Sequence, residues 1–276
     1  MTRPYAEVIG DPIAQSKSPL IHGFWLSRLG VEADFRASHI TPGDLARFVA
    51  DRRDDKDWLG CNVTIPHKEQ IGACLDRIEP RAAGLGAINT VYRDADGQLC
   101  GTNTDIDGVA EALRGFDLAG EKVVVLGAGG AARAAFAHLA GTGCLASVLA
   151  RDAEKARVAI THCGLQAKVL PFAGGTSAFD DAMLVINTTQ LGMTGEAAMP
   201  RFILEEIDQM NRDALVFDMV YAPRETALLK AASLSGRATA GGLTMLVGQA
   251  RTAFTRFFGR QPPTGTDAEL MRMLTA

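Results

Sequence analysis

The chain has 276 residues, of which 47% are hydrophobic and 22% charged, and its formal net charge at pH 7 is −4. These values are typical of a globular protein with one large or two modest domains. They argue against a nucleic-acid-binding surface, and the absence of a Lys/Arg run argues against a membrane-binding patch. The first residues do not resemble a secretory leader, because Arg3, Pro4 and Glu7 interrupt any apolar run.

The cysteines and histidines show no spacing typical of a metal site. There are five of each, with no C-x-x-C pair and no H-x-x-x-H pair. An odd number of cysteines without such a motif indicates reduced thiols, so we expect a cytoplasmic protein. We also expect no structural or catalytic metal.

Short strands and helices alternate over the first hundred residues. Alternation of apolar and polar residues, with Gly and Pro at the ends of segments, predicts the elements. Residues 93–97 (RDADG) contain an Asp-Gly pair, which is typical of a hairpin between two strands. We expect strands over 5–10, 33–40, 58–63, 87–92 and 98–104, and helices over 18–30, over 41–50 and from Pro66 onwards.

A second unit begins near residue 107. Residues 122–126 (KVVVL) read as a buried strand and lead into a glycine-rich turn and a helix of small residues. Strands alternating with helices predict a parallel, doubly wound sheet, so the fold class is α/β. We expect further strands over 145–150, 183–187 and 214–219, and helices over 223–236 and 243–259.

The glycine-rich turn has the pattern G-x-G-x-x-[GA], formed by Gly127, Gly129 and Ala132. It follows a strand and opens a helix, which is the context that binds a dinucleotide. The first Gly permits the tight turn, the second lets the backbone approach a pyrophosphate, and the small third residue lets the helix pack on the strand. A lone pattern is weak evidence, but in this context we favour a dinucleotide site over a merely tight turn.

The end of the next strand indicates which dinucleotide is bound. Arg151 stands there, and a guanidinium binds a 2′-phosphate well, with Lys155 as a second cation. Asp152 is the counter-argument, because an acidic residue facing the ribose favours NAD. Arg151 and Asp152 could also form a surface ion pair. We predict NADP, with NAD possible.

Polar residues follow several strands of the first half. Each has an ordinary structural explanation: Ser18 could cap a helix, Thr64 could belong to a turn, Asn89 could bond a strand edge and Asp105 could cap the next helix. On neighbouring parallel strands, however, they would line one cleft at the carboxyl ends of those strands. The candidates are Ser16, Ser18, Thr64, Lys68, Asn89 and Asp105.

Several motifs in order along nearly the whole chain resemble the shikimate dehydrogenase family. They are residues 10–22 (GDPIAQSKSPLIH), 62–68 (NVTIPHK), 86–90 (GAINT), 103–105 (NTD), 127–133 (GAGGAAR), 187–193 (NTTQLGM), 218–223 (DMVYAP) and 245–250 (MLVGQA). The resemblance implies two α/β domains with a cleft between them. A substrate-binding domain would comprise 1–106 plus 240–276, and a Rossmann-like NADP-binding domain 107–239.

The resemblance also implies an activity and a role for each matching residue. The activity is reversible oxidation of the shikimate 3-hydroxyl to 3-dehydroshikimate with NADP, in a monomer or homodimer without nucleic-acid or membrane partners. Lys68 and Asp105 match the catalytic pair. Substrate contacts would come from Ser16, Ser18, Thr64, Asn89, Tyr221 and Gln249. Cofactor contacts would come from Gly127, Ala128, Gly129, Gly130, Ala131, Arg151, Lys155, Thr188, Met219 and Gly242.

Elementary chemistry agrees with the implied catalytic pair. When a hydride leaves the carbon, the hydroxyl must also lose its proton, and a side chain within hydrogen-bond reach must take it. Lys68 suits this task if it is neutral. Burial would favour the neutral amine and the nearby Asp105 would favour the charged one, so the sequence leaves the balance open.

Some positions depart from the family pattern. Ala150 stands where an Asn usually helps to hold the 2′-phosphate, and Ile106 follows Asp105 where Gly is usual. Two alternatives therefore stay open. One is an NAD(P)-dependent quinate/shikimate dehydrogenase-like paralogue with a shifted substrate, and the other is a non-catalytic nucleotide-binding homologue.

Overall fold

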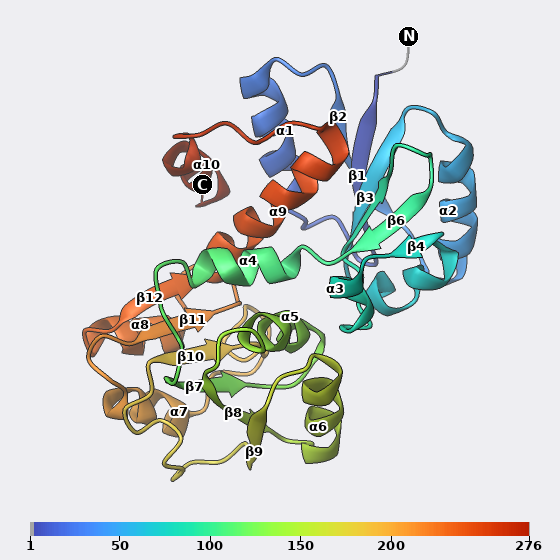
Figure 1. Cartoon of the computed structure of the whole chain (residues 1–276). Coiled ribbons are helices and arrows are strands. Elements are labelled where there is room, and N and C mark those ends of the chain that lie inside the picture. The colour runs from blue at the N-terminus through green and yellow to red at the C-terminus, as the bar shows by residue number, and fades with distance from the viewer. Residues whose placement is uncertain (1–2, 276) are drawn as a thin grey trace. The chain divides into compact units, whose positions relative to one another are not determined.

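A computed structural model describes residues 3–275. It divides into two compact units: unit 1 runs to Asp105 and resumes at Gln249, and unit 2 comprises Ile106–Gly248. Figure 1 shows the elements of each unit. The second boundary falls inside a long helix, whereas the sequence placed it at 239/240.

Unit 1 contains a six-stranded sheet among its described residues, in the order β2-β1-β3-β5-β6-β4. Only β5 runs antiparallel to its neighbours; the remaining pairings that build this sheet are parallel. The hairpin predicted between the strands over 87–92 and 98–104 is therefore confirmed, and only the placement of Asn89 on a parallel strand was wrong. The Asp-Gly turn explains the reversal, because Gly97 has φ 82° and closes a hairpin. The strands are β1 Tyr5–Gly10, β2 Asp34–His39, β3 Trp58–Val63, β4 Arg77–Ile78, β5 Thr90–Arg93 and β6 Leu99–Thr102.

Helices of unit 1 begin and end close to the predicted positions, with one clear exception. The helix expected from Pro66 is replaced by two short 3-10 helices, η2 and η3. The helices are α1 Ser18–Leu29, η1 Pro42–Asp44, α2 Leu45–Asp54, η2 His67–Glu69, η3 Ile71–Cys74, α3 Pro80–Ala83 and α10 Asp267–Thr275, with the later part of α9 Gly242–Phe258. The sequence did not predict β4, α3 or α10.

Unit 2 contains a six-stranded parallel sheet among its described residues, in the order β12-β11-β10-β7-β8-β9. This is the doubly wound order, and its switch point lies between β7 and β10. Of these strands, β9 and β12 were not predicted. The strands are β7 Lys122–Leu126, β8 Leu145–Ala150, β9 Ala167–Pro171, β10 Leu184–Asn187, β11 Leu215–Asp218 and β12 Ala238–Gly241.

Both faces of the unit 2 sheet are buried. On β7, Val123 and Val125 belong to one hydrophobic cluster, and Val124 and Leu126 belong to another. Because successive side chains of a strand point to opposite faces, each face needs its own layer of helices. The helices are α4 Asp105–Ala112, α5 Gly130–Leu139, α6 Ala153–His162, α7 Arg201–Glu206, η4 Ile207–Gln209 and α8 Ala227–Leu234, with the first turns of α9.

In the part of the chain that the structure describes, no helix is long and apolar enough to cross a membrane. All five cysteines are free thiols. Among the same residues, no group of three or more His, Cys, Asp or Glu side chains could hold a metal ion.

Candidate functional site

The predicted catalytic residues meet at one edge of the unit 1 sheet. Lys68 follows β3, Asp105 follows β6, and Asn89 comes directly before β5. Since β5 is antiparallel to β3 and β6, its first residues lie beside the last residues of those strands. The reversal of β5 therefore brings Asn89 to this edge, where a parallel β5 would have carried it away.

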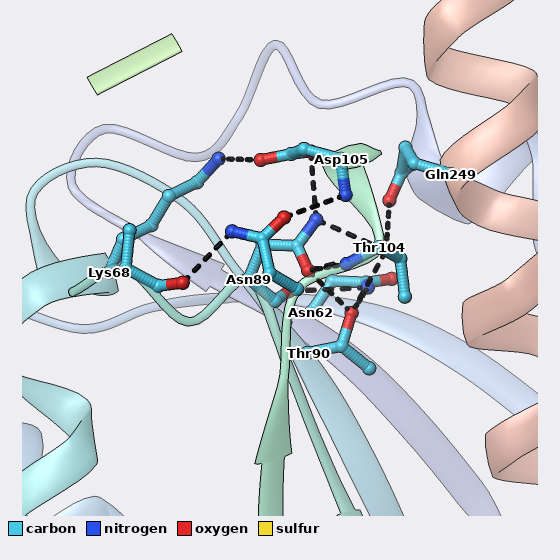
Figure 2. A network of polar contacts seen from close by, with 9 residues as sticks. Asn62, Lys68, Asn89, Thr90, Thr104, Asp105 and Gln249 are labelled. Atoms are coloured by element: carbon cyan, nitrogen blue, oxygen red, sulfur yellow. Dashed lines mark hydrogen bonds and ion pairs between the residues drawn. The ribbon is translucent and has the colours of Figure 1, made fainter. Parts of the chain in front are cut away.

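Lys68 and Asp105 form an ion pair at this edge (Figure 2). Lys68 Nζ donates to Asp105 Oδ2 over 2.7 Å, and the two side chains are 29% and 17% exposed. Asn89 Nδ2 donates to the other carboxylate oxygen, Oδ1, over 2.8 Å. Both oxygens of Asp105 are thus held by side chains, so the carboxylate does not serve merely as a helix cap.

The orientation of the Asn89 amide is fixed by its neighbours. The backbone N–H of Thr104 donates to Asn89 Oδ1 over 2.7 Å, and the Thr90 hydroxyl donates to the same oxygen over 3.0 Å. An amide N–H can only donate, so Oδ1 must face Thr104 and Nδ2 must face Asp105. Asn89 is buried, and its Nδ2 also donates to the Thr104 hydroxyl over 3.1 Å.

Three polar residues that the sequence did not select complete this network. Asn62 Nδ2 donates to Thr90 Oγ1 over 3.1 Å, and Thr104 Oγ1 donates to Gln249 Oε1 over 3.3 Å. Asn62, Thr90 and Thr104 are all buried. Each stands within a recognised motif, and the signal that could have found them is a polar side chain in an otherwise buried segment.

Gln249 belongs to the predicted substrate contacts and lies on α9. Its side chain is 7% exposed. Because its Oε1 accepts from the Thr104 hydroxyl, the position of its amide is tied to the same network that holds Asn89. The late return of the chain into unit 1 thus brings Gln249 to Thr104, far away in sequence.

The turn that carries Lys68 is anchored on both sides. Neighbouring His67 is fully buried, and its Nε2 donates to the carbonyl of Ile40 over 2.7 Å. The carbonyl of Lys68 accepts from the backbone N–H of Ile88 over 2.7 Å. These contacts fix the backbone at Lys68 although the segment is a short 3-10 helix. Asn62 Nδ2, before this turn, donates toward the start of β5, to the Asn89 carbonyl and the Thr90 hydroxyl.

The hydroxyls of Ser16, Ser18 and Thr64 remain available at the ends of β1 and β3. Lys17 stands at the N-cap position of α1, so Ser18 is not the cap. Ser16 Oγ accepts from the backbone N–H of Ser18 over 3.3 Å, which leaves its own hydrogen free to donate. Within residues 3–275, the hydroxyls of Ser18 and Thr64 make no hydrogen bond.

The glycine-rich turn of unit 2 is open where a phosphate would approach. Gly127 has φ 97°, and a Cβ there would lie 2.7 Å from a methyl group of Thr189, so only Gly fits. Gly129 and Gly130 have no atom within 4 Å of the place where a Cβ would stand. The backbone at the start of α5 is therefore accessible, next to Ala128 and Ala131.

The other predicted cofactor residues follow neighbouring strands of the same sheet. Thr188 follows β10 and its hydroxyl donates to the carbonyl of Leu126 over 2.7 Å, so it braces the glycine turn. Met219 follows β11, and a Cβ on Gly242 would lie 2.2 Å from the Met219 carbonyl oxygen. Gly242 is therefore required by backbone packing. Tyr221 is 39% exposed in unit 2.

A buried carboxylate supports the loops after β10 and β11. Asp218 accepts from Asn187 Nδ2 over 2.9 Å, from the Thr226 hydroxyl over 2.6 Å and from the backbone N–H of Val220 over 3.0 Å. Burial raises the pKa of Asp218, and these hydrogen bonds act in the opposite direction. They hold the loop that carries Met219 and the N-terminus of α8.

The two side chains at the end of β8, Arg151 and Asp152, differ in their contacts. Asp152 is the N-cap of α6, and its side chain accepts from the backbone N–H of Lys155 over 3.0 Å. Arg151 is exposed and makes no hydrogen bond or ion pair with any described residue. The surface ion pair between Arg151 and Asp152, which the sequence left open as an alternative, therefore does not form.

Comparisons with known proteins match both ends of the chain to one family. Residues 8–91 match the shikimate dehydrogenase substrate binding domain, and residues 242–272 match the shikimate 5'-dehydrogenase C-terminal domain. A shikimate dehydrogenase (NADP(+)) from Sphingopyxis alaskensis is 44% identical over 274 residues, which cover 99% of this chain and 97% of the relative.

Two solved structures are similar over nearly their full lengths. Shikimate 5-dehydrogenase from Thermus thermophilus, in complex with NADP(H) and shikimate, is 32% identical with a TM-score of 0.85, covering 98% of this chain and 99% of that one. Ligand-free 5-ketofructose reductase of Gluconobacter sp. strain CHM43 is 28% identical with a TM-score of 0.90, covering 99% of both. From its matching domains and its identity to these relatives, the chain belongs to the shikimate dehydrogenase family.

Proposed function

We propose that this protein is an NADP-dependent oxidoreductase that interconverts shikimate and 3-dehydroshikimate. The observation that carries the proposal is the Lys68–Asp105 pair, with 2.7 Å between Nζ and Oδ2 and with Asn89 on the second oxygen. A proton-transfer pair held in this way is what oxidation of a hydroxyl requires. Relatives at 38–44% identity carry the name shikimate dehydrogenase (NADP(+)), which supports the choice of substrate.

Lys68 moves the proton. In the oxidation direction the neutral amine takes the proton of the substrate hydroxyl on Nζ, and in the reduction direction the ammonium returns it to the carbonyl oxygen. Asp105 accepts a hydrogen bond from Nζ and so holds the amine in place. Asn89 uses both of its amide hydrogens within the network. We therefore assign it to positioning Asp105 rather than to contacting the substrate directly.

Ser16, Ser18 and Thr64 bind the substrate. The serine hydroxyls are neutral donors with a free hydrogen at the end of β1, suited to a carboxylate, and Thr64 adds a hydroxyl after β3. A buried or half-buried donor without a partner is costly, so a bound carboxylate that accepts from these serines gains affinity. Gln249, held by Thr104, supplies an amide for a ring hydroxyl.

The residues of unit 2 fit NADP. Gly129 and Gly130 form the N-terminus of α5 with open backbone, which suits a pyrophosphate, and the unpaired guanidinium of Arg151 suits a 2′-phosphate. NADP bound to these residues would supply the hydride acceptor that oxidation of the substrate hydroxyl requires. Asp152 has one oxygen engaged in capping α6, which supports NADP over NAD.

The test is absorbance at 340 nm with purified protein, combining shikimate or quinate with NADP or NAD at alkaline pH. We expect fast NADPH formation with shikimate and NADP, and Lys68→Ala serves as the inactive control. Strong NADH formation with quinate would instead establish the quinate/shikimate alternative. No change in absorbance in any combination, with NADP binding retained, would refute the proposal in favour of a non-catalytic homologue.

A second candidate is reduction of a ketose, favoured by the likeness to 5-ketofructose reductase over 99% of the chain. The same assay run in reverse separates the two, with NADPH and either 3-dehydroshikimate or 5-ketofructose. Only 3-dehydroshikimate has a carboxylate for Ser16 and Ser18. We expect it to be reduced with the higher kcat/KM, and the opposite order would favour the ketose.

A further inference from the structure

Glu79 is a half-buried carboxylate of unit 1 that the proposed reaction does not use. Its Oε1 accepts from the Tyr92 hydroxyl over 2.6 Å, and its Oε2 accepts from the Thr102 hydroxyl over 2.8 Å. Arg256, on α9, pairs with Oε1 at 3.1 Å, and the Glu79 side chain is only 17% exposed. One carboxylate thus joins β5, β6 and α9.

The guanidinium of Arg256 is held by Tyr92 as well as by Glu79. Its Nη1 donates to the Tyr92 hydroxyl over 3.4 Å, and its central carbon lies 4.9 Å from the centre of the Tyr92 ring, where a cation is attracted. Burial raises the pKa of Glu79, but the hydrogen bonds from Tyr92 and Thr102 and the charge of Arg256 outweigh it and hold this pKa below its ordinary value. The carboxylate is therefore charged at neutral pH, and the pair belongs to a network, which makes it stronger than an isolated surface pair.

Arg256 and Gln249 lie on one face of α9. They are seven residues apart, which is two helical turns, so their side chains point in nearly the same direction. Gln249 Oε1 accepts from the Thr104 hydroxyl over 3.3 Å (Figure 2). Arg256 is joined through Glu79 to Thr102, two residues before Thr104. The helix is thus attached at two points to the same segment of chain.

The position of the Gln249 amide depends on the rotation of α9 about its own axis. Ala253 and Phe257 pack in one hydrophobic cluster with residues of the sheet, but apolar contact has no preferred direction. A rotation of about 10° moves a side-chain tip that lies about 6 Å from the axis by about 1 Å. That is enough to break the 3.3 Å hydrogen bond of Gln249. The directional contacts of Arg256 oppose such a rotation.

We propose that Glu79 is a positioning residue for substrate binding: it holds Arg256 and thereby fixes the rotation of α9 that directs the Gln249 amide. The inference rests on the proposed function for the role of Gln249, which is to bind a ring hydroxyl of the substrate.

The first test compares Glu79→Gln and Arg256→Met with the wild type in the shikimate assay. Each variant removes the charge of one partner and keeps a side chain of similar length. We expect either to raise KM for shikimate about fivefold, while kcat and KM for NADP change by less than about twofold. Unchanged KM for shikimate in Arg256→Met would overturn the proposal.

The matched control is Asp267→Asn. It removes the carboxylate that pairs with Arg251, which also lies on α9 but points about 200° around the helix from Gln249. We expect KM for shikimate to stay within about 1.5-fold of the wild type. A rise equal to that of Arg256→Met would mean that any loosening of α9 has this effect, and would overturn the proposal.

A double-mutant cycle separates positioning from a general loss of structure. In a Gln249→Ala background, we expect Arg256→Met to change KM for shikimate by less than about 1.5-fold, because no amide remains to be misplaced. A loss of packing or stability would act equally in both backgrounds. Effects of the two substitutions that simply multiply would therefore overturn the proposal.

Failure of this inference can be told from failure of the proposed function. The side-chain amide of Gln249 gives NMR signals in isotope-labelled protein, identified by their loss in Gln249→Ala. Without substrate, we expect Arg256→Met to shift or broaden these signals and Asp267→Asn to leave them unchanged. That result in protein that does not oxidise shikimate would remove the proposed substrate and leave the positioning of Gln249 by Glu79 and Arg256 standing. Signals that Arg256→Met leaves unchanged, in protein that oxidises shikimate, would remove the positioning role alone.

Discussion

Asn89 and Asp105 are joined by a hydrogen bond of 2.8 Å from Nδ2 to Oδ1, and this bond leaves the other carboxylate oxygen to Lys68. The amide cannot turn over, because the backbone N–H of Thr104 requires an acceptor where Oδ1 stands. The carboxylate is therefore held before any substrate binds. Such preorganisation places the Lys68 amine in one geometry for proton transfer.

Replacement of Lys68 by Ala removes the group that we assign to proton transfer. We expect kcat to fall about 10²–10⁴-fold, while the affinity for NADP stays within about threefold. Steady-state kinetics and NADP titration measure the two quantities. Lys56→Ala, at an exposed position of the same unit, is the control and should leave kcat unchanged. Turnover near the wild-type rate in Lys68→Ala would exclude Lys68 from the mechanism.

Asn89→Asp places a carboxylate against Asp105. A like charge replaces the Nδ2 donor at 2.8 Å, so we expect kcat to fall about 100-fold at pH 8. The difference in kcat between Asn89→Asp and the wild type should become smaller as the pH falls, because one of the two carboxyls then keeps a proton and can donate a hydrogen bond again. Rates of mutant and wild type compared between pH 6 and 9 measure this.

The matched control is Asn211→Asp. Asn211 Nδ2 also donates to an aspartate, Asp181, over 2.8 Å, but this pair lies on the surface of unit 2. We expect its kcat and pH profile to match those of the wild type. Equal losses in the two variants, or a deficit in Asn89→Asp that does not depend on pH, would contradict the positioning role.

Double replacement of Ser16 and Ser18 by Ala removes two neutral donors for the substrate carboxylate. We expect KM for shikimate to rise about tenfold to hundredfold, while kcat changes by less than about threefold. Initial rates over a range of shikimate concentrations measure both. Ser27→Ala, exposed on α1, is the control. If KM stays unchanged in the double variant, the carboxylate binds elsewhere.

Gly129 and Gly242 should respond in opposite ways to replacement by Ala. At Gly129 the added methyl group meets no protein atom within 4 Å, so stability should change by less than about 1 kcal/mol, whereas NADP affinity should fall at least about tenfold. At Gly242 the methyl group would lie 2.2 Å from the Met219 carbonyl oxygen, so stability should fall by about 2 kcal/mol or more. Urea unfolding and NADP titration of both variants test this, and the reverse pattern would refute it.

His22 should make the protein less stable in acid. It is fully buried, stacked on Phe35 with ring centroids 4.0 Å apart, and neither ring nitrogen has a hydrogen-bond partner among residues 3–275. Burial lowers the pKa of His22 from 6.5 to about 3. Between these values the unfolded chain binds a proton that the folded chain does not. Stability is therefore lost as the pH falls from about 6.5 toward 3, by about 2 kcal/mol at pH 5.

Urea unfolding of His22→Phe at pH 7.5 and pH 5 tests this. The difference in unfolding free energy between the two pH values should be about 2 kcal/mol smaller than in the wild type. The exposed His162, replaced by Gln, is the control and should keep the wild-type difference. An unaltered difference in His22→Phe would mean that His22 does not contribute to the acid response.

The sequence predicted the strands that carry the candidate site, because each is a short, largely apolar run with turn-forming residues such as Gly, Pro, Asn or Asp close to its ends. It predicted β1, β3 and β7 with the bounds that the structure shows, and it selected Lys68, Asn89 and Asp105. It missed β4, β9 and β12. The first has only two residues, and the other two are edge strands whose weakly apolar residues give little periodic signal.

Only the tertiary structure determined which side chains are in contact with one another. The Asp-Gly pair predicted a hairpin, but the sequence could not show that β5 lies between β3 and β6, which brings Asn89 to Asp105. Nor could it show that Asn62, Thr90 and Thr104 form the network behind them. Local pattern determines the elements, because propensity and burial act over a few residues. Contacts between side chains depend on strand direction and helix face, which long-range packing sets.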